Sequence, residues 1–192
     1  MKPLIIVFFL IAFADCGDTC EKYKNEIYTG KTLEQTFDST RLNGFKQYLI
    51  MLHEHEINTL NYESYRLIAH VSHVPSYIIQ IENKNSIYHV THKKLIHDSD
   101  STFVVVKQIE KQLSADEWAK FIAFIYQKNY WTLPINTNKY DVLDGGQYTI
   151  EGRRPNAEIC GKRSYHLITS DHPQGEFKDL FDNFFEIIEP QK

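Results

Sequence analysis

Cysteine is scarce in this chain, and so are long apolar runs. Its 192 residues include only three cysteines, too few for a disulfide-stabilised scaffold or for a zinc site built from cysteines. After residue 14, no stretch approaches the roughly 18 consecutive apolar residues that a membrane-spanning helix needs. We therefore expect no transmembrane span and a fold that depends on an ordinary apolar core.

An excess of positive charge is also missing. The formal net charge is -4, so we do not expect a nucleic-acid-binding protein. The chain contains neither a G-x-S-x-G nucleophile elbow nor a glycine-rich phosphate loop, and it shows no internal repeat. With 42% apolar residues, the composition is typical of a globular protein. No motif in the chain predicts a bound cofactor.

Residues 1–14 have the pattern of a secretory signal peptide. Lys2 precedes an apolar run of about a dozen residues, which ends at residues 12–14 in an A-x-A cleavage pattern. Cleavage there leaves Asp15 as the first residue of an exported protein, either periplasmic or secreted. In a second interpretation Cys16 is acylated and tethers the protein to a membrane. Asp15 fits that lipoprotein pattern poorly, because the residue before the acylated cysteine is normally small and uncharged.

Export places the three cysteines in an oxidising compartment, where disulfides form. Their odd number leaves one of them unpaired, lipidated or bonded to another molecule. We expect a bond between Cys20 and Cys160, with Cys16 left over, and three independent thiols are the alternative. Such a bond joins the N-terminal segment to a distant part of the chain and adds about 4–5 kcal/mol of stability before strain.

The chain after the signal peptide divides into a polar segment at residues 15–42 and a single domain at residues 43–192. Ser114 and Glu117 form a capping box, which marks the start of the clearest helix. Apolar spacing predicts helices at residues 44–56, 114–129 and 175–188. Alternating and β-branched stretches predict strands at residues 64–71, 77–82, 86–92, 103–108, 147–153 and 164–169.

The order of these elements indicates the fold class. Strands cluster before and between the helices instead of alternating strictly with them. This order predicts an α+β fold with a mainly antiparallel sheet and the helices packed on one face. In the first strand, alternation places Tyr65 and Leu67 on one face of the sheet and Arg66, Ile68 and His70 on the other.

Nine histidines raise the question of a metal site. His53 and His55 are two residues apart and point away from each other on a helix, and Ile57 stands where an H-E-x-x-H motif has its second histidine. Histidines from different strands are able to assemble a site, so a histidine-based metal-binding protein is one alternative. Residues 170–172, Ser-Asp-His, contain the residue types of a catalytic triad, but their place before a helix favours a capping turn.

Asp144, Glu151 and His166 are candidates for acid–base chemistry. Two carboxylates and an imidazole that share one cleft are able to act as general acid and base, which would make the protein a small hydrolase. We favour a simpler interpretation, in which Asp144 belongs to a turn and the other two residues lie on exposed strand faces.

Four basic residues flank the long loop that we expect between the last two strands. Paired strands bring these charges together at one tip, where they are able to meet an anionic surface ligand or an acidic envelope protein. A solvated hairpin end is the alternative. The residues are Arg153, Arg154, Lys162 and Arg163.

Three motifs in sequence order resemble those of an uncharacterised family of small exported bacterial proteins. The W-x-L-P motif lies at residues 131–134, the D-G-x-x-(W/Y)-x-x-E-G motif at 144–152 and the Y-H motif at 165–166, and residues 65–67 and 113–118 also fit. The resemblance covers about residues 65–190 and implies export and the α+β fold. It implies no activity. The chain departs from the family by the segment at 154–162, which lengthens the last hairpin, and by the Asp-His-Pro sequence at 171–173.

We therefore expect an exported, non-enzymatic binding or interaction domain of the bacterial envelope. Its partner would be an envelope protein or an anionic surface ligand. The alternatives are the small hydrolase with Asp144, Glu151 and His166 and the histidine-based metal-binding protein.

Overall fold

A computed structural model describes residues 39–71, 74–98, 103–135, 146–159 and 162–188, and within these ranges all side chains except those of 39–43, 155–159 and 162–164. The predicted signal peptide and most of the predicted polar segment lie outside the described residues. The helices and strands are α3 (Ser39–Met51), η1 (Ile57–Thr59), β1 (Glu63–His70), β2 (Ser76–Lys84), β3 (Ile87–His97), β4 (Phe103–Leu113), α4 (Ala115–Gln127), η2 (Tyr130–Thr132), β5 (Gln147–Ile159), β6 (Lys162–Ser170) and α5 (Gly175–Ile188).

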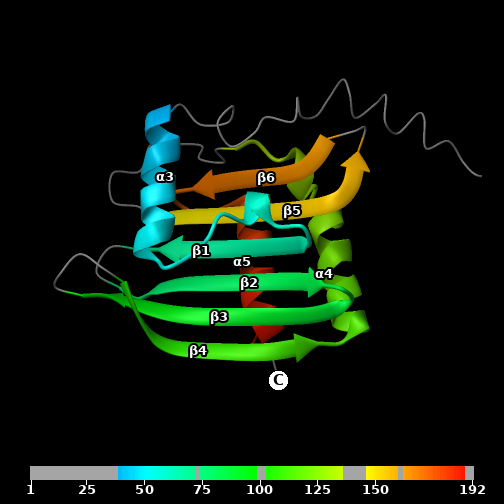
Figure 1. Cartoon of the computed structure of the whole chain (residues 1–192), viewed down its shortest axis with the longest axis horizontal. Helices are drawn as coiled ribbons and strands as arrows, with labels where there is room; N and C mark the ends of the chain where they lie inside the picture. The colour runs from blue at the N-terminus through cyan, green and yellow to red at the C-terminus, as the bar shows by residue number, and fades with distance from the viewer. Residues whose placement is uncertain (1–38, 72–73, 99–102, 136–145, 160–161, 189–192) are drawn as a thin grey trace, which may run out of the picture.

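A six-stranded sheet forms the centre of the fold (Figure 1). The strand order is β4-β3-β2-β1-β5-β6, and all neighbouring strands are antiparallel. The first four strands follow one another as a meander, and the chain then returns past α4 to place β5 and β6 beside β1. The predicted α+β fold with a mainly antiparallel sheet is confirmed.

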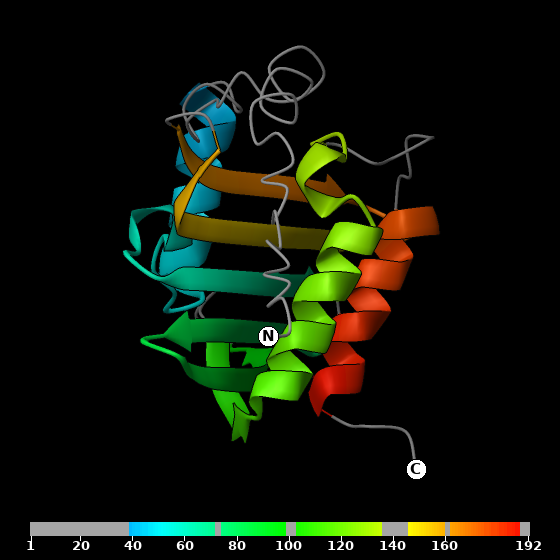
Figure 2. The ribbon, with the colours of Figure 1, turned by 90° about the vertical axis from the view of Figure 1, so that its right-hand side faces the viewer.

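Helices α4 and α5 lie side by side on one face of this sheet (Figure 2). Phe121 of α4 and Phe184 of α5 pack on each other and on apolar side chains of the strands, among them Tyr65 of β1. The predicted capping box starts α4, because Ser114 Oγ accepts from the Glu117 amide at 3.2 Å and Glu117 Oε2 accepts from the Ser114 amide at 2.8 Å. The third predicted helix has the same bounds as α5.

Helix α3 packs on the opposite face, so the prediction that all helices share one face is wrong. Phe45, Leu49 and Leu52 bury their side chains against Ile68 of β1 and Leu167 of β6, in a second apolar cluster. The physical reason lies in β1, where residues on both faces are buried. A sheet with two apolar faces needs cover on both of them.

The bounds of α3 also differ from the prediction of residues 44–56. The helix starts at Ser39, inside the segment predicted to be an irregular polar stretch, and ends at Met51. His53 then adopts a left-handed conformation with a φ of 55°, which ends the helical path. Residues 53–56 consequently form an irregular connection that runs along the sheet towards η1.

The predicted long loop after residue 153 is wrong as well. The backbone of β5 continues to Ile159 and β6 begins at Lys162, so most of the expected loop is paired strand. Between Arg154 and Ile159, the pairing of β5 with β6 shifts register, as it does at a β-bulge. Cys160 lies outside the described residues.

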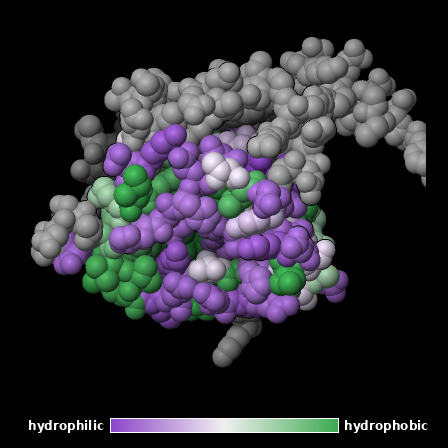
Figure 3. Space-filling model, in the orientation of Figure 1, coloured by the Kyte–Doolittle hydropathy of each residue, from purple (hydrophilic) through white to green (hydrophobic). Residues whose placement is uncertain are grey.

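The covering of the α3 face is incomplete. In Figure 1, α3 crosses one end of the strands, and the middle of β2, β3 and β4 stays uncovered on this side. Figure 3 shows mostly hydrophilic side chains over the same area. Among the described residues, no helix is both long and apolar enough to cross a membrane.

Candidate functional site

A buried arginine lies beneath the partly covered face. Arg66 of β1 has an exposed fraction of 0%. Its Nε donates to Oε2 of Glu151 on the neighbouring strand β5 at 2.8 Å, and its Nη2 contacts the same oxygen. Its Nη1 donates to the backbone oxygen of His55 at 2.7 Å. A buried guanidinium needs such partners, because an unpaired buried charge is strongly destabilising.

Tyr165 of β6 completes the coordination of Glu151. Its hydroxyl donates to Oε1 of Glu151 at 2.8 Å, so both oxygens of this carboxylate accept hydrogen bonds. Burial, together with the charge of Glu151, holds the pKa of Tyr165 well above its usual range. Tyr165 therefore stays a neutral donor, and three adjacent strands are joined by one polar network.

The same network reaches the surface through Glu54. Oε2 of Glu54 lies 3.5 Å from Nη1 of Arg66, and Oε1 lies 2.5 Å from Nζ of Lys93 on β3. Together with the bond from Arg66 to the His55 carbonyl, these contacts attach the connection at residues 53–56 to the sheet. A segment without regular secondary structure is thereby fixed at a defined height above the strands.

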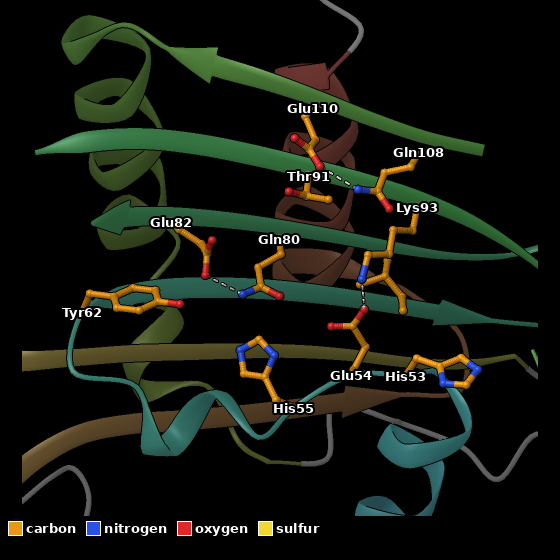
Figure 4. Close-up of a pocket in the computed structure, with 11 residues that line it drawn as sticks. His53, Glu54, His55, Tyr62, Gln80, Glu82, Thr91, Lys93, Gln108 and Glu110 are labelled. Atoms are coloured by element: carbon orange, nitrogen blue, oxygen red, sulfur yellow. Dashed lines mark hydrogen bonds and ion pairs between the residues drawn. The ribbon is translucent and has the colours of Figure 1, made fainter. Parts of the chain in front are cut away.

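A groove lies between this connection and the strands. Its volume is about 280 Å³. Figure 4 shows that the His53–His55 connection borders one side and that side chains of β2, β3 and β4 form the floor and the other side. The floor residues include Gln80, Thr91 and Glu110, which lie in register across the three strands.

The polar side chains of the groove are already ordered by one another. Nε2 of Gln80 donates to Glu82 at 2.8 Å, and Nε2 of Gln108 donates to Glu110 at 2.6 Å. Burial and the neighbouring Glu82 carboxylate raise the pKa of Tyr62, at one end of the groove, to about 12. A preorganised polar surface of this kind binds a ligand with little further loss of side-chain entropy.

The structure does not bring Glu151 and His166 together. Glu151 is paired with Leu167 and His166 with Gly152, so the two side chains lie on opposite faces of the sheet. Both are buried, with an exposed fraction of 1% each, so the expectation that they lie on exposed strand faces is wrong. The acid–base group of the hydrolase alternative is not assembled from these two residues, and Asp144 lies outside the described residues.

His166 is buried against η2. Its ring lies 5.1 Å from the ring of Tyr130, centroid to centroid, and the Tyr130 hydroxyl donates to the backbone oxygen of His166 at 2.8 Å. Burial lowers the pKa of His166 to about 4, although hydrogen bonding to the backbone of Leu133 and Tyr130 opposes this shift. The imidazole is therefore neutral at pH 7 and acts as part of the packing.

Arg153 and Arg154 do not form the predicted basic tip. Arg153 has an exposed fraction of 2%, and its Nε donates to the backbone oxygen of Leu60 at 3.1 Å. Arg154 is on the other face of the strand, where its Nε lies 2.8 Å from Oε1 of Glu63 and its guanidinium lies over the ring of Tyr126. Because β5 continues to Ile159, both arginines lie within the sheet and not at a hairpin tip. Both guanidiniums have partners within the chain.

Other candidate residues fall outside what the structure describes. The side chains of Lys162 and Arg163 are not described, although their backbone belongs to β6. Cys16, Cys20 and Cys160 lie outside the described residues. The expected disulfide and the lipidation alternative therefore stay predictions.

The residues that build the groove were not predicted from the sequence. Arg66 had one available signal, since alternation placed this charged residue on the same face as Ile68, within a strand that is apolar on its other face. Gln80, Thr91 and Glu110 had none, because polar residues alternating along a strand usually indicate an exposed face.

Within the described ranges, no three His, Cys, Asp or Glu side chains are grouped closely enough to hold a metal ion. Comparisons with models of protein families, with curated proteins and with solved structures found no match. The resemblance to a family of exported bacterial proteins therefore stays a prediction. The site is defined by its own geometry, as a preorganised polar groove on a partly covered antiparallel sheet.

Proposed function

We propose that this chain is a non-enzymatic binding protein of the bacterial envelope, and that it binds a small polar ligand in the groove over β2, β3 and β4. The observation that carries the proposal is the attachment of residues 53–56 to the sheet. Arg66 and Lys93 hold Glu54 and the His55 carbonyl in place, and this forms one wall of a groove that stays open to solvent.

The cost of this attachment supports a role in binding. A buried Arg–Glu pair contributes little net stability, because desolvation of both charges offsets their attraction. Apolar side chains of similar volume would hold the connection equally well. The network instead fixes the position of Glu54 and the backbone of His55 at the groove, and precise placement of polar groups is what ligand recognition needs.

The positions of the other candidates favour binding over hydrolysis. Glu151 is engaged by Arg66 and Tyr165, and His166 lies on the other side of the sheet. A general acid and a general base must reach the same substrate within hydrogen-bond distance. Since the sheet separates this pair, we place the function in the groove.

The groove can be tested by NMR on the ¹⁵N-labelled protein, with a small-molecule fraction from the envelope of its native host. We expect amide shifts at Gln80, Thr91 and Glu110 and at residues 53–55. Amides of α5, behind the sheet, are the internal control and should stay in place. Shifts spread over the whole chain, or no shift at the groove, would contradict the proposal.

The envelope location depends on residues 1–14 and is tested by the intact mass of the protein from that host. A mass that begins at Asp15 supports a cleaved signal peptide, and a mass that begins at an acylated Cys16 supports a lipoprotein. A mass that includes residue 2 would contradict export by cleavage. Mass measured before and after reduction and alkylation also decides whether Cys20 and Cys160 are bonded.

A further inference from the structure

The hydrogen-bonding groups in the groove are unevenly available. An amide side chain has both donor and acceptor capacity, whereas an ionised carboxylate only accepts. Nε2 of Gln80 donates to Glu82 and to Ser64, at 2.8 and 3.3 Å, and Nε2 of Gln108 donates to Glu110. These internal bonds use both N–H donors of the Gln80 amide and one of the two on Gln108, and they leave the two carbonyl oxygens as acceptors.

The ammonium of Lys93 gives one of its three donors to Oε1 of Glu54, at 2.5 Å, and keeps the other two. Glu110 accepts from Gln108, and Glu82 accepts from Gln80 and is hydrogen-bonded to Tyr62. Each of these carboxylates has about four acceptor positions, so both keep acceptor sites for a ligand. The surface that a ligand meets is therefore rich in acceptors. A complementary ligand must supply several donors in a small volume.

The placement of charge argues against an anionic ligand. Glu54 is paired with Lys93 and lies near the guanidinium of Arg66. At the Glu82 end of the groove, the ammonium of Lys84 lies 5.4 Å from the centre of the Tyr62 ring. An anionic ligand would face the carboxylates of Glu54, Glu82 and Glu110, and a cationic ligand is the competing outcome of the titration.

The floor of the groove offers polar side chains on three neighbouring strands. Gln80, Thr91 and Glu110 lie on three neighbouring strands, and strands are about 4.8 Å apart. Ile78, Lys93 and Gln108 form a second row, about 6.8 Å along the strands. All of these positions except Ile78 carry a hydrogen-bonding side chain, so a ring with several hydroxyl groups is able to reach more than one of them.

We infer that the ligand of this groove is a neutral saccharide, whose hydroxyl groups donate to the oxygens of Gln80, Gln108, Glu82 and Glu110. The inference rests on the proposed function and assigns its ligand class. Sugar hydroxyls are compact donors that also accept, so they fit a surface with many acceptors and a smaller number of available donors. The volume of about 280 Å³ suits one or two sugar rings.

Calorimetric titration with neutral trisaccharides of glucose and of N-acetylglucosamine tests the inference, with spermidine as a cationic probe. We expect at least one trisaccharide to bind, and its affinity to stay within about twofold between low salt and about 0.5 M sodium chloride, because a neutral ligand has no charge to screen. NMR shifts should locate the sugar on β2, β3 and β4.

Two substitutions at one position separate hydrogen bonding from charge. Glu110→Ala removes the acceptors and should weaken trisaccharide binding about tenfold, the equivalent of one good hydrogen bond. Glu110→Gln keeps an acceptor without the charge and should stay within about threefold of the parent protein. Gln112→Ala is the matched control, since Gln112 is an exposed residue on the same face of β4, outside the groove.

The outcomes distinguish this inference from the function on which it rests. If spermidine binds in the groove, weakens with salt and is lost equally in Glu110→Ala and Glu110→Gln, the ligand is a cation, and only the saccharide assignment fails. If neither trisaccharide binds while the envelope fraction still shifts the groove amides, the assignment also fails alone. If nothing shifts the groove amides, both proposals are wrong.

Discussion

The hydroxyl of Tyr165 donates a hydrogen bond of 2.8 Å to Oε1 of Glu151, on the neighbouring strand. Glu151 is the glutamate of the D-G-x-x-(W/Y)-x-x-E-G motif, and Tyr165 is the tyrosine of the Y-H motif. Arg66, from a third segment, donates to the other oxygen of the same carboxylate. Residues that are widely separated in the sequence thus form one buried network, and this network supports the wall of the groove.

Tyr165→Phe should destabilise the protein by about 1–2 kcal/mol, because the substitution leaves one oxygen of a buried carboxylate without its donor. Urea unfolding measures the effect as a lower midpoint with an unchanged slope. Tyr126→Phe is the matched control: Tyr126 is exposed on α4, and its ring, which lies under Arg154, is kept. Equal midpoints for both variants would show that the Tyr165 hydroxyl contributes nothing.

Arg66 and Glu151 should behave as one unit in a double-mutant cycle. Arg66→Met or Glu151→Met alone leaves a buried charge without its main partner and should cost about 3–5 kcal/mol of unfolding free energy. The double variant should cost clearly less than the sum, since it removes both charges. Additive losses would indicate that the two side chains contribute independently.

Gly152→Ala should destabilise the protein, and Gly44→Ala should not. A Cβ at residue 152 would lie 2.7 Å from Cε1 of Tyr130, so the Tyr130 ring must move, at a cost of about 1–3 kcal/mol. A Cβ at residue 44, within α3, meets nothing within 4 Å, and alanine there should add about 0.5–1 kcal/mol. Thermal unfolding of the two variants measures both signs, and a loss at residue 44 as large as that at 152 would refute the steric explanation.

Stability should fall as the pH decreases from about 6.5 to about 4. Burial lowers the pKa of His166 to about 4 in the folded state, so in this window the unfolded chain binds more protons than the folded one. The loss amounts to up to about 3 kcal/mol at the lower end. Burial and the neighbouring His97 also lower the pKa of His70, which adds a change of the same sign.

Two measurements test this pH dependence. Urea unfolding at several pH values gives the slope, which His166→Gln should reduce. NMR titration of the His166 ring in the parent protein is independent of how well that variant folds, and it should show a neutral imidazole down to about pH 4. Protonation of this ring near pH 6.5 without loss of structure would be incompatible with its burial.

The elements with a local physical cause could be predicted from the sequence. The capping box at Ser114 and Glu117 determines the start of α4 by hydrogen bonds within four residues, and the apolar spacing of residues 175–188 identifies α5. The face on which α3 packs has no such local cause. Its apolar stripe fits either side of a sheet whose first strand is buried on both faces.

The groove could not be predicted for a related reason. Its residues come from five separate segments, and only the antiparallel register places Gln80 beside Thr91 and Thr91 beside Glu110. The candidates chosen from the sequence, Glu151 and His166, lie on the paired strands β5 and β6. Glu151 is opposite Leu167, the residue after His166, so alternation directs the two candidates to opposite faces. Polar residues in a strand indicate chemistry only once the register and the cover of each face are known.

A groove-filling substitution tests the central claim most directly. Gln108 and Lys107 are exposed neighbours on β4 and point to opposite faces, so tryptophan at either position makes a similar change to the strand, but only Gln108→Trp fills the groove. For the compound that shifts the groove amides, we predict a loss of affinity of at least about tenfold in Gln108→Trp and less than about twofold in Lys107→Trp. Equal affinities in the two variants would contradict a binding site in this groove.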